Sequence, residues 1–533
     1  MLFRSSEIPL SLSAEEGELL RQAAARLSLP EQQIRSLTIL KKSVDARKKQ
    51  DVHFQYTVGV TLESGEETVL SRCGGAKISR FQPYSYELPP CRRLGKRPVV
   101  VGFGPAGMFA ALILAQAGQR PIVIERGADA DKRTQQVDAF WKGGVLNPET
   151  NVQFGEGGAG TFSDGKLNTG TKDGRAGKVF EELVKAGAPE EILYDAKPHV
   201  GTDLLPGIVK KIRGQIVELG GEIRFETKLV EIVSVQDRAT GVIVEHDGER
   251  QQLDTHHVIL AIGHSARDTF EGLLEQGVAM EQKPFSIGAR IEHPQAAINC
   301  TQYSAFAEHP ALGAADYKLA VHLENGRGVY TFCMCPGGQV VAAASEPGRL
   351  VTNGMSRWAR DEKNANSALL VGVSSADFES THPLAGMWFQ RRWEEAAFHL
   401  GGGDYRAPAQ RVGDFLKGKA SDSFGTAPSY QPGVVPADLS GCLPPYAVES
   451  MRQGILLMDR RLRGFAHPDA VLTGVETRSS SPVRLTRGAD GQSVTLGGLY
   501  PCGEGAGYAG GIVSAAVDGI RSAEAVLTSP KEG

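Results

Sequence analysis

The chain has 533 residues, of which 64 are glycine, and it carries a formal net charge of −4 with 41% hydrophobic and 23% charged residues. This length exceeds what a single hydrophobic core usually organises, so we expect two or three domains. The ordinary composition and near-neutral charge exclude a disordered chain and argue against broad binding to nucleic acid or to acidic membranes.

Targeting and membrane signals are not evident in the sequence. No apolar run reaches the roughly 18 residues that span a bilayer, and residues 1–10 lack the basic and apolar regions of a secretory signal. The seven cysteines include no Cys-x-x-Cys pair, which argues against a disulfide framework or a structural zinc site. We therefore expect a cytoplasmic protein with reduced thiols and no membrane association.

Residues 1–85 are predicted to form a small α+β module. The pattern indicates a strand, a helix over residues 14–27, and two extended segments over 34–44 and 52–62. The basic stretch at 41–49 lacks interleaved aromatic residues that would stack on bases, so we interpret it as a solvated turn. Binding of RNA or another polyanion is the alternative, and nucleic acid is not the expected partner.

A dinucleotide-binding unit follows a proline-containing linker at residues 83–98. A run of β-branched residues leads into a Gly-x-Gly-x-x-Gly turn, an apolar helix and a second apolar strand that ends on Glu125. Gly102 allows the tight turn, Gly104 lets a pyrophosphate approach the backbone, and Gly107 lets helix and strand pack closely. Glu125 is placed to accept hydrogen bonds from adenosine ribose hydroxyls. A glycine turn that serves packing only is the alternative.

Three later segments indicate that the dinucleotide is FAD. Residues 152–166 are rich in glycine and small hydroxyl residues, residues 254–263 read as a strand that closes on Ala261-Ile-Gly263, and residues 498–512 lead into a final helix. A chain that returns to its first nucleotide-binding half after hundreds of residues is unusual for an NAD domain and typical of an FAD domain. No second nicotinamide-binding unit of strand, Gly-x-Gly-x-x-Gly turn, helix and further strand follows, so only transient binding of NAD(P)H as an electron donor stays open. The sequence also lacks clustered metal-ligand spacing, so no metal is expected.

These motifs resemble known families. The set that resembles the FAD-binding domain of the glutathione reductase and succinate dehydrogenase superfamily is Gly102-Phe-Gly-Pro-Ala-Gly107, Glu125-Arg126, Ala261-Ile-Gly263, Gly503-Glu504 and Gly510-Gly511. Three further stretches are similar to a family of uncharacterised bacterial FAD-dependent dehydrogenases, also called NAD-utilising dehydrogenases: residues 154–167, 332–338 and 478–484.

The resemblance implies an α/β fold. It predicts a Rossmann-like FAD-binding domain of the glutathione reductase type, an inserted α+β substrate domain and the small N-terminal α+β module. We expect the FAD-binding domain to comprise residues 97–283 and 440–533, with the substrate domain at residues 284–439.

The motifs and the resemblance together give a set of cofactor-binding residues. The 155–166 loop would border the pyrophosphate and flavin, and Glu504 would bind the ribityl chain, although the wider superfamily more often has Asp there. The start of the final helix would present N–H groups to the flavin pyrimidine side, where reduction places negative charge; a plain glycine-rich loop is the alternative. The predicted residues are Gly102, Gly104, Pro105, Ala106, Gly107, Glu125, Arg126, Gly157, Gly158, Thr161, Ser163, Lys166, Val230, Ala261, Gly263, Gly503, Glu504, Gly510, Gly511 and Ile512.

Candidate substrate residues lie in and beside the inserted domain. Cys333 and Cys335 would face the same side of a strand, and we favour pocket lining over a redox dithiol, because a Cys-x-Cys disulfide closes a strained ring. Arg478 and Arg484 would either clamp a carboxylate or phosphate or hold the turn before the last strand. His264 is a candidate general acid, with a surface or capping role favoured. No catalytic residue is assigned.

Three function classes remain open from the sequence. The leading hypothesis is an FAD-dependent dehydrogenase or reductase that passes a hydride between flavin N5 and a small organic substrate. The second is a flavoprotein that acts on or binds RNA or protein through its N-terminal module. The third is a non-catalytic flavin-containing scaffold. The sequence identifies neither the substrate nor the oligomeric state.

Overall fold

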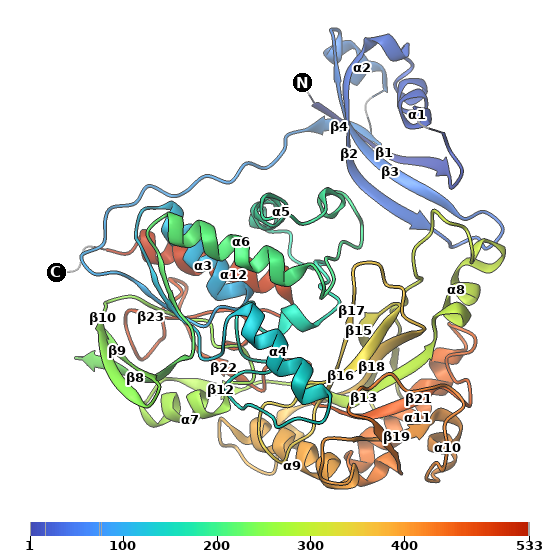
Figure 1. Cartoon of the computed structure of the whole chain (residues 1–533). Helices are drawn as coiled ribbons and strands as arrows, with labels where there is room; N and C mark the ends of the chain where they lie inside the picture. The colour runs from blue at the N-terminus through green and yellow to red at the C-terminus, as the bar shows by residue number, and fades with distance from the viewer. Residues whose placement is uncertain (1, 16, 74, 76, 531–533) are drawn as a thin grey trace.

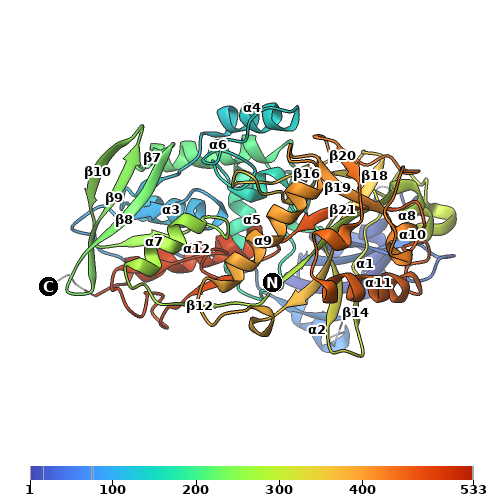
Figure 2. The ribbon, with the colours of Figure 1, turned by 90° about the horizontal axis from the view of Figure 1, so that it is seen from below.

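The computed structural model describes residues 2–15, 17–73, 75 and 77–530. An N-terminal module, a parallel-sheet body and a second, mostly antiparallel sheet follow one another (Figure 1). Seen from below, the body and the second sheet lie side by side with α9 (Ala385–Leu400) near their junction (Figure 2). Among the residues so described, no helix is both long and apolar enough to cross a membrane.

The N-terminal module has the β-α-β-β-α-β order of a ferredoxin-like unit. Its elements are β1 (Leu2–Ser11), α1 (Glu18–Leu27), β2 (Ile34–Asp45), β3 (His53–Leu62), α2 (Glu66–Cys73) and β4 (Ile78–Phe81). The antiparallel sheet has the order β2-β3-β1-β4 and buries its own apolar core, which includes Phe3, Leu27 and Val58. The first helix begins at Glu18 rather than at residue 14, because Gly17 has a φ of +90° that no right-handed helix accommodates.

The basic stretch of the module takes part in its attachment to the rest of the chain. The Lys42 amide donates to the Tyr194 carbonyl at 2.8 Å, and the Ala196 amide donates back to the Lys42 carbonyl at 2.8 Å. The Lys49 ammonium donates to the carbonyl of Gln302. Two lysines of this stretch therefore make contacts within the protein.

The segment after the module lies along the body. The Tyr86 hydroxyl donates to a Glu524 carboxylate oxygen at 3.1 Å, and the Leu94 amide donates to Gln119 at 2.9 Å. Side-chain contacts therefore fix the predicted linker to the body.

The body is built on five parallel strands in the order β23-β11-β5-β6-β7. These strands are β5 (Val99–Val101), β6 (Ile122–Ile124), β7 (Glu222–Arg224), β11 (Val258–Leu260) and β23 (Leu499–Pro501). All residues of β5, β6 and β11 are buried, and most are valine or isoleucine. Such continuous apolar strands are typical of a parallel sheet that is covered on both faces. Strand β23 pairs with β11, so the chain returns to the first sheet from its far end, as expected for an FAD-binding fold.

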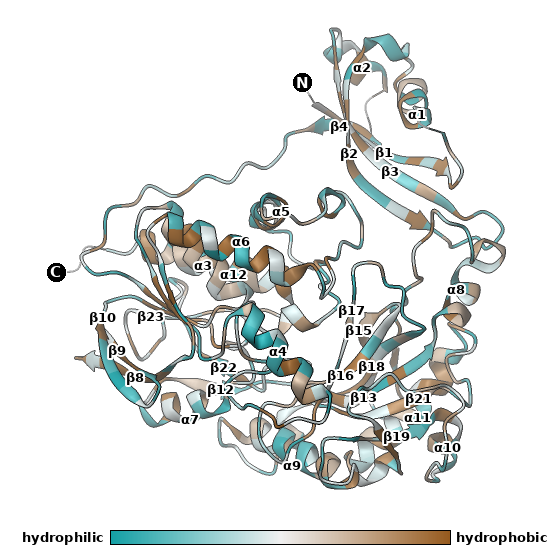
Figure 3. Cartoon of the chain, in the orientation of Figure 1, coloured by the Kyte–Doolittle hydropathy of each residue, from teal (hydrophilic) through white to brown (hydrophobic). Residues whose placement is uncertain are grey.

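Helices cover this sheet, and a small antiparallel sheet extends it. The elements are α3 (Pro105–Gln116), α4 (Ala130–Trp141), α5 (Arg175–Lys185), α6 (Leu205–Glu218), α7 (Arg267–Glu275), α12 (Ile512–Leu527), β8 (Thr227–Val235), β9 (Arg238–His246) and β10 (Glu249–Asp254). Helix α3 is almost wholly buried and packs against α12, whereas α4 is largely hydrophilic (Figure 3).

The second sheet has seven strands in the order β14-β15-β18-β13-β21-β19-β20. They are β13 (Phe285–Pro294), β14 (Ala320–His322), β15 (Gly328–Cys335), β18 (Asn364–Val373), β19 (Ala407–Arg411), β20 (Val434–Pro436) and β21 (Val471–Glu476). The surrounding elements are β16 (Gly338–Ala342), β17 (Thr352–Ser356), α8 (Gln295–Tyr303), α9, α10 (Val412–Lys417) and α11 (Pro445–Asp459). The short pair β12 (Met280–Gln282) and β22 (Val483–Leu485) lies where the chain passes between the body and the second sheet.

The structure places the return to the body later than the sequence analysis did. We expected the chain to return to the body at residue 440. In the structure, α11 packs against the second sheet, β21 is one of its strands, and the chain returns to the body at β22. A fully buried run such as β21 fits either sheet by its composition, and only its pairing with β13 assigns it.

Candidate functional site

The first glycine turn joins β5 to α3 with no room for side chains. Gly102 has a φ of +95°, and a Cβ there would overlap the backbone of Ala261. A Cβ at Gly107 would overlap the carbonyl of Gly102. Pro105 is the first residue of α3, where its missing N–H is not needed. The free N–H groups of this helix start therefore face the turn, as an anion site requires.

A second glycine loop packs directly on this turn. Gly157 and Gly158 have φ values of +86° and +64°, and the Gly157 amide donates to the carbonyl of Phe103 at 2.9 Å. A Cβ at Gly158 would lie 2.9 Å from the Gly104 Cα. Two glycine backbones thus meet at a point where any side chain would intrude.

The far end of the chain reaches the same place. Gly503 has a φ of +75°, and a Cβ there would lie 2.7 Å from the Ala106 Cβ. A Cβ at Gly505 would overlap the carbonyl of Gly263. We call residues 102–107, 155–158, 261–263 and 503–505 the glycine site.

Helix α12 begins beside the glycine site. Its N-cap residue is Gly511, with a φ of +131°, and Ile512 lies 3.2 Å from where a Cβ of Gly160 would be. Gly510 is exposed and has open space around it. Two helix N-termini, those of α3 and α12, therefore flank the glycine site and favour negative charge there.

Glu125 ties the two glycine loops together. Its carboxylate accepts hydrogen bonds from the amides of Phe103, Gly127 and Gly155, each at 2.9 Å. A carboxylate offers about four lone-pair sites, so capacity for one further donor remains. Its predicted contact with ribose hydroxyls stays a prediction.

Arg126 anchors the same loop from the other side. Its guanidinium contacts both carboxylate oxygens of Asp268 at 2.9 and 3.0 Å, donates to Glu149 at 2.7 Å, and lies 4.2 Å from the centre of the Phe154 ring. Burial alone would raise the pKa of Asp268, but the hydrogen bonds and charges of Arg126 and Lys228 lower it. The predicted cofactor residue Arg126 is therefore occupied by carboxylates in this structure.

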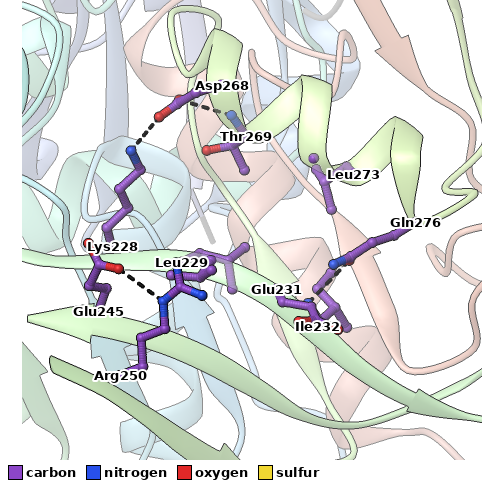
Figure 4. Close-up of a pocket in the computed structure, with 12 residues that line it drawn as sticks. Lys228, Leu229, Glu231, Ile232, Glu245, Arg250, Asp268, Thr269, Leu273 and Gln276 are labelled. Atoms are coloured by element: carbon purple, nitrogen blue, oxygen red, sulfur yellow. Dashed lines mark hydrogen bonds and ion pairs between the residues drawn. The ribbon is translucent and has the colours of Figure 1, made fainter. Parts of the chain in front are cut away.

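A cavity of about 230 Å³ opens between α7 and the small antiparallel sheet (Figure 4). Val230 lines it, together with Lys228, Asp268 and Gln276. The Lys228 ammonium lies 2.5 Å from Asp268 at one end, and Gln276 accepts a hydrogen bond from the Ile232 amide at the other (Figure 4). The predicted cofactor residue Val230 thus borders an open, partly polar space next to the Arg126 cluster.

The loop that follows the second glycine segment reaches the second sheet. The Thr161 carbonyl accepts from the Thr202 hydroxyl at 2.8 Å, and the Ser163 hydroxyl donates to the Gly160 carbonyl at 2.6 Å. The Lys166 ammonium lies 2.9 Å from Asp164 and also donates to the carbonyl of Met334 in β15. Lys166 therefore links the glycine-rich loop to β15.

Glu504 and His264 face each other at the edge of the glycine site. The His264 Nε2 atom lies 4.0 Å from Glu504 Oε1, and His264 Nδ1 is 3.0 Å from the Ser265 hydroxyl. Burial raises the pKa of Glu504 to about 7, although the charge of Lys283 opposes it. Burial, together with the charges of nearby arginines, lowers the pKa of His264 to about 3. The lowered pKa leaves His264 uncharged at neutral pH.

Arg478 and Arg484 do not converge on one point. The Arg478 guanidinium is buried and binds Glu394 at 2.8 and 3.0 Å, whereas Arg484 is partly exposed and pairs with Glu281 at 3.3 Å. These contacts favour the alternative in which the two arginines support the turn between β21 and β22.

Cys333 and Cys335 lie on β15 next to Lys166. Cys333 is partly exposed, and Cys335 is buried. The register of β15 against β18 shifts between Phe332 and Cys335, so the two cysteines sit on a bulge rather than on a regular strand. Their place at the substrate stays a prediction.

The sequence analysis did not identify several charged residues that are buried in the structure. Arg133 of α4 donates to the carbonyls of Asn151, Val152, Gly155 and Glu156, which holds the second glycine loop in shape. Other missed residues include Asp164, Arg267, Arg290, Glu394 and Glu476. Each has a partner that is distant in sequence, and no local pattern distinguishes these residues from surface charges.

The comparisons with known proteins follow the same division of the chain. Residues 97–269 match an "FAD binding domain" model, residues 284–479 match "FAD-dependent protein, C-terminal domain-like", and residues 3–61 match a domain of unknown function. An uncharacterized protein of Clostridium beijerinckii is 52% identical over 531 residues, which cover 99% of each chain.

More distant similarities have low sequence identity. A thiamine thiazole synthase of Aeropyrum pernix is 26% identical over 197 residues, which cover 35% of this chain and 60% of that protein. A geranylgeranyl bacteriochlorophyll reductase-like protein of Thermoplasma acidophilum aligns with a TM-score of 0.37 at 12% identity, over 80% of this chain and 77% of that one. A flavin-dependent brominase mutant has the same TM-score of 0.37 at 13% identity, over 82% and 81%. These TM-scores are too low to support any inference about substrate or mechanism.

The FAD-binding match agrees with the glycine site, and the nearly full-length relative shows that the chain belongs to one family with the Clostridium beijerinckii protein, a family whose members carry an FAD-binding domain.

Proposed function

We propose that the protein is an FAD-dependent dehydrogenase or reductase that acts on a small organic substrate held against the second sheet. The observation that carries the proposal is the meeting of four glycine stretches from distant parts of the chain at two helix N-termini. We also propose that the chain belongs to the NAD-utilising dehydrogenases. NADH or NADPH would then be the electron donor.

The residues of the glycine site would hold the cofactor by their backbones. The amides at the start of α3 would bind the pyrophosphate, and those at the start of α12 would face the flavin pyrimidine ring. FAD, when bound, supplies hydride acceptance and donation at N5. The glycines let these stretches pack closely together, because a Cβ at Gly158 or Gly503 would lie within 3 Å of a backbone or methyl carbon.

Glu504 would bind the ribityl chain of the cofactor, as the motif implies, and its carboxyl group would also be able to take up or release a proton. Its pKa of about 7 lets it hold a proton just below neutral pH and release it just above. Lys283 lies close enough to affect that pKa and donates to the Ser480 hydroxyl at 2.7 Å. His264, which stays uncharged, would position Glu504 rather than act as an acid.

Anaerobic reduction of the purified protein tests the proposal. We would add NADH, NADPH and a panel of reduced metabolites under anaerobic conditions and follow the visible absorbance of the bound flavin. Loss of that absorbance with at least one donor, at a rate that saturates with its concentration, is expected. If no donor reduces the flavin and no acceptor reoxidises the chemically reduced protein, the non-catalytic scaffold would replace this proposal.

A further inference from the structure

Cys333 has an unusual backbone conformation. Its φ is +42°, in the left-handed region that non-glycine residues seldom adopt, and it forms part of the bulge in β15. Such outliers persist only where their surroundings enforce them, and they concentrate at functional positions. This conformation leaves the Cys333 side chain partly exposed, whereas Cys335 is buried.

Two cations contact the bulge. The Arg290 guanidinium donates to the Cys333 carbonyl at 2.9 Å and contacts the Cys335 sulfur at 3.6 Å. The Lys166 ammonium donates to the carbonyl of Met334, the residue between the two cysteines. Arg290 comes from β13 of the second sheet, and Lys166 comes from the loop that continues the glycine site.

Neighbouring carboxylates only partly neutralise these cations. Asp164 lies 2.9 Å from Lys166, and Glu476 lies 3.1 Å from Arg290. Burial is the main cause that raises the pKa of Glu476 and of Glu504 to about 7, and the negative charge at Cys333 adds to it. Cys333 therefore shares one electrostatic environment with Glu504 of the glycine site.

The same groups also affect the pKa values of the two cysteines. The hydrogen bond with Cys335 lowers the pKa of Cys333, and Lys166 and Arg290 lower it further, against the effects of burial and of Asp164. The pKa of Cys335 is raised by that hydrogen bond and by burial. Burial also raises the pKa of Cys442 to about 12 and the pKa of Cys502.

We propose that Cys333 is a reactive thiol site for small soft electrophiles, placed on the second sheet where the glycine-rich loop reaches it, with Lys166 as its positioning residue. The arrangement meets two requirements of a reactive cysteine: a partly exposed side chain and neighbouring cations. This goes beyond the proposed oxidoreductase function and does not require the cofactor to be present.

Alkylation of the full-length protein as purified tests this inference. In the reaction with iodoacetamide, the thiolate sulfur attacks the CH₂ carbon, a C–S bond forms, the C–I bond breaks and iodide leaves. Peptide mass spectrometry would give the rate at each cysteine across a pH series. We expect Cys333 to react fastest near neutral pH, with a midpoint at least about one pH unit below the ordinary value of about 8.5.

Variants separate a positioning role of Lys166 from a purely structural one. Lys166→Met should raise the midpoint of Cys333 without changing the rates at the exposed Cys91 and Cys300, and Lys166→Arg should largely restore it. Lys228→Met, which removes a lysine that pairs with Asp268, is the matched control and should leave Cys333 unchanged. A midpoint at the ordinary value, or one that Lys166→Met leaves unmoved, would overturn the inference.

The colour of the same preparation keeps this inference distinct from the proposed function. A preparation that neither contains nor takes up FAD, but in which Cys333 reacts fast, would end the proposed function and support the thiolate. A yellow preparation whose Cys333 reacts like an ordinary cysteine would support FAD binding and would overturn the inference about Cys333.

Discussion

Glu125 shows how a single side chain can organise the cofactor loops. Its carboxylate joins the first glycine turn, its own loop and the second glycine loop through three backbone amides. Glu125→Ala should leave these amides without their partner, at about 1–3 kcal/mol for each that stays buried and unpaired. We expect the purified variant to retain much less FAD and to unfold at a lower denaturant concentration, as measured by visible absorbance and circular dichroism.

The control for Glu125 is Glu245→Ala. Glu245 lies in the same half of the body but forms only a peripheral ion pair with Arg250 at 3.1 Å, and such pairs contribute roughly 0–1 kcal/mol. Equal FAD retention in the two variants would show that Glu125 does not organise the loops.

The glycines of the site offer a sharper comparison. Gly158→Ala places a Cβ at 2.9 Å from the Gly104 Cα on a residue with a φ of +64°, whereas Gly143→Ala, outside the glycine site and at a φ of +92°, places one in open space. We expect Gly158→Ala to weaken FAD binding at least tenfold, or about 1.4 kcal/mol, and Gly143→Ala to change it little. Fluorescence titration of the apoprotein with FAD measures both, and equal affinities would contradict the close approach of the two loops.

At the residue scale, sequence reasoning identified backbone roles better than side-chain roles. Gly102 and Gly107 follow from the sterics of a strand, turn and helix that are adjacent in the chain. The partner of Arg478 could not be predicted in this way, because Glu394 lies on a separate helix, 84 positions away in the chain. No periodicity connects two such residues, and only the packed fold brings them together.

At the element scale, a buried charge network joins the body to the second sheet. Glu394 of α9 binds Arg267 of α7 at 2.7 Å and Arg478, which follows β21, at 2.8 Å. It also accepts from the Thr477 hydroxyl at 2.6 Å. The carboxylate of Glu394 therefore connects α7 of the body with the segment that follows β21 of the second sheet.

Glu394→Gln should destabilise the protein strongly. It removes the buried counter-charge that two guanidinium groups share, although both still pair with Glu346, and breaking a buried pair costs about 3–5 kcal/mol. We expect a clear fall in the midpoint of urea unfolding. Glu395→Gln, on the next and exposed residue of the same helix, should leave the midpoint unchanged. Equal midpoints for the two variants would mean that the network adds nothing to stability.

The stabilising effect of Glu394 should also depend on pH. The pKa of Glu394 is well below its ordinary value, because the charges of Arg267 and Arg478 outweigh the effect of burial. A depressed carboxyl pKa stabilises the fold above the unfolded value of about 4.3, and this contribution is lost as the pH falls toward the folded value. The difference in unfolding free energy between the natural protein and Glu394→Gln should be largest at neutral pH and should narrow below pH ~4. A constant difference would contradict this ionisation.

Individual helices and strands were easier to predict than the sheet in which each strand pairs. The strands and helix around the first glycine turn could be predicted, because hydrophobic runs and glycine positions are local signals. The assignment of β21 and α11 to the second sheet could not, since a buried strand has the same composition in either sheet. Parallel pairing over several hundred residues, as between β23 and β11, was inferred only from the recurrence of glycine motifs.

At the scale of the whole molecule, the N-terminal module is separable from the cofactor site. It has its own core, and none of the glycine site lies within residues 1–82. A chain that starts at residue 83 keeps the contacts of Tyr86 and Leu94 with the body. We expect it to bind FAD with an affinity within about threefold of the full chain, or roughly 0.7 kcal/mol. Loss of FAD binding in a folded truncated protein would give the module a direct part in the cofactor site.

The central claim is that backbone groups from four distant stretches of the chain jointly hold one FAD. Denaturing the purified full-length protein and identifying the released compound by chromatography and mass spectrometry tests it most directly. The account predicts a yellow protein that releases one FAD per chain. A colourless protein that takes up no FAD when it is supplied, or a protein that releases FMN instead, would contradict it.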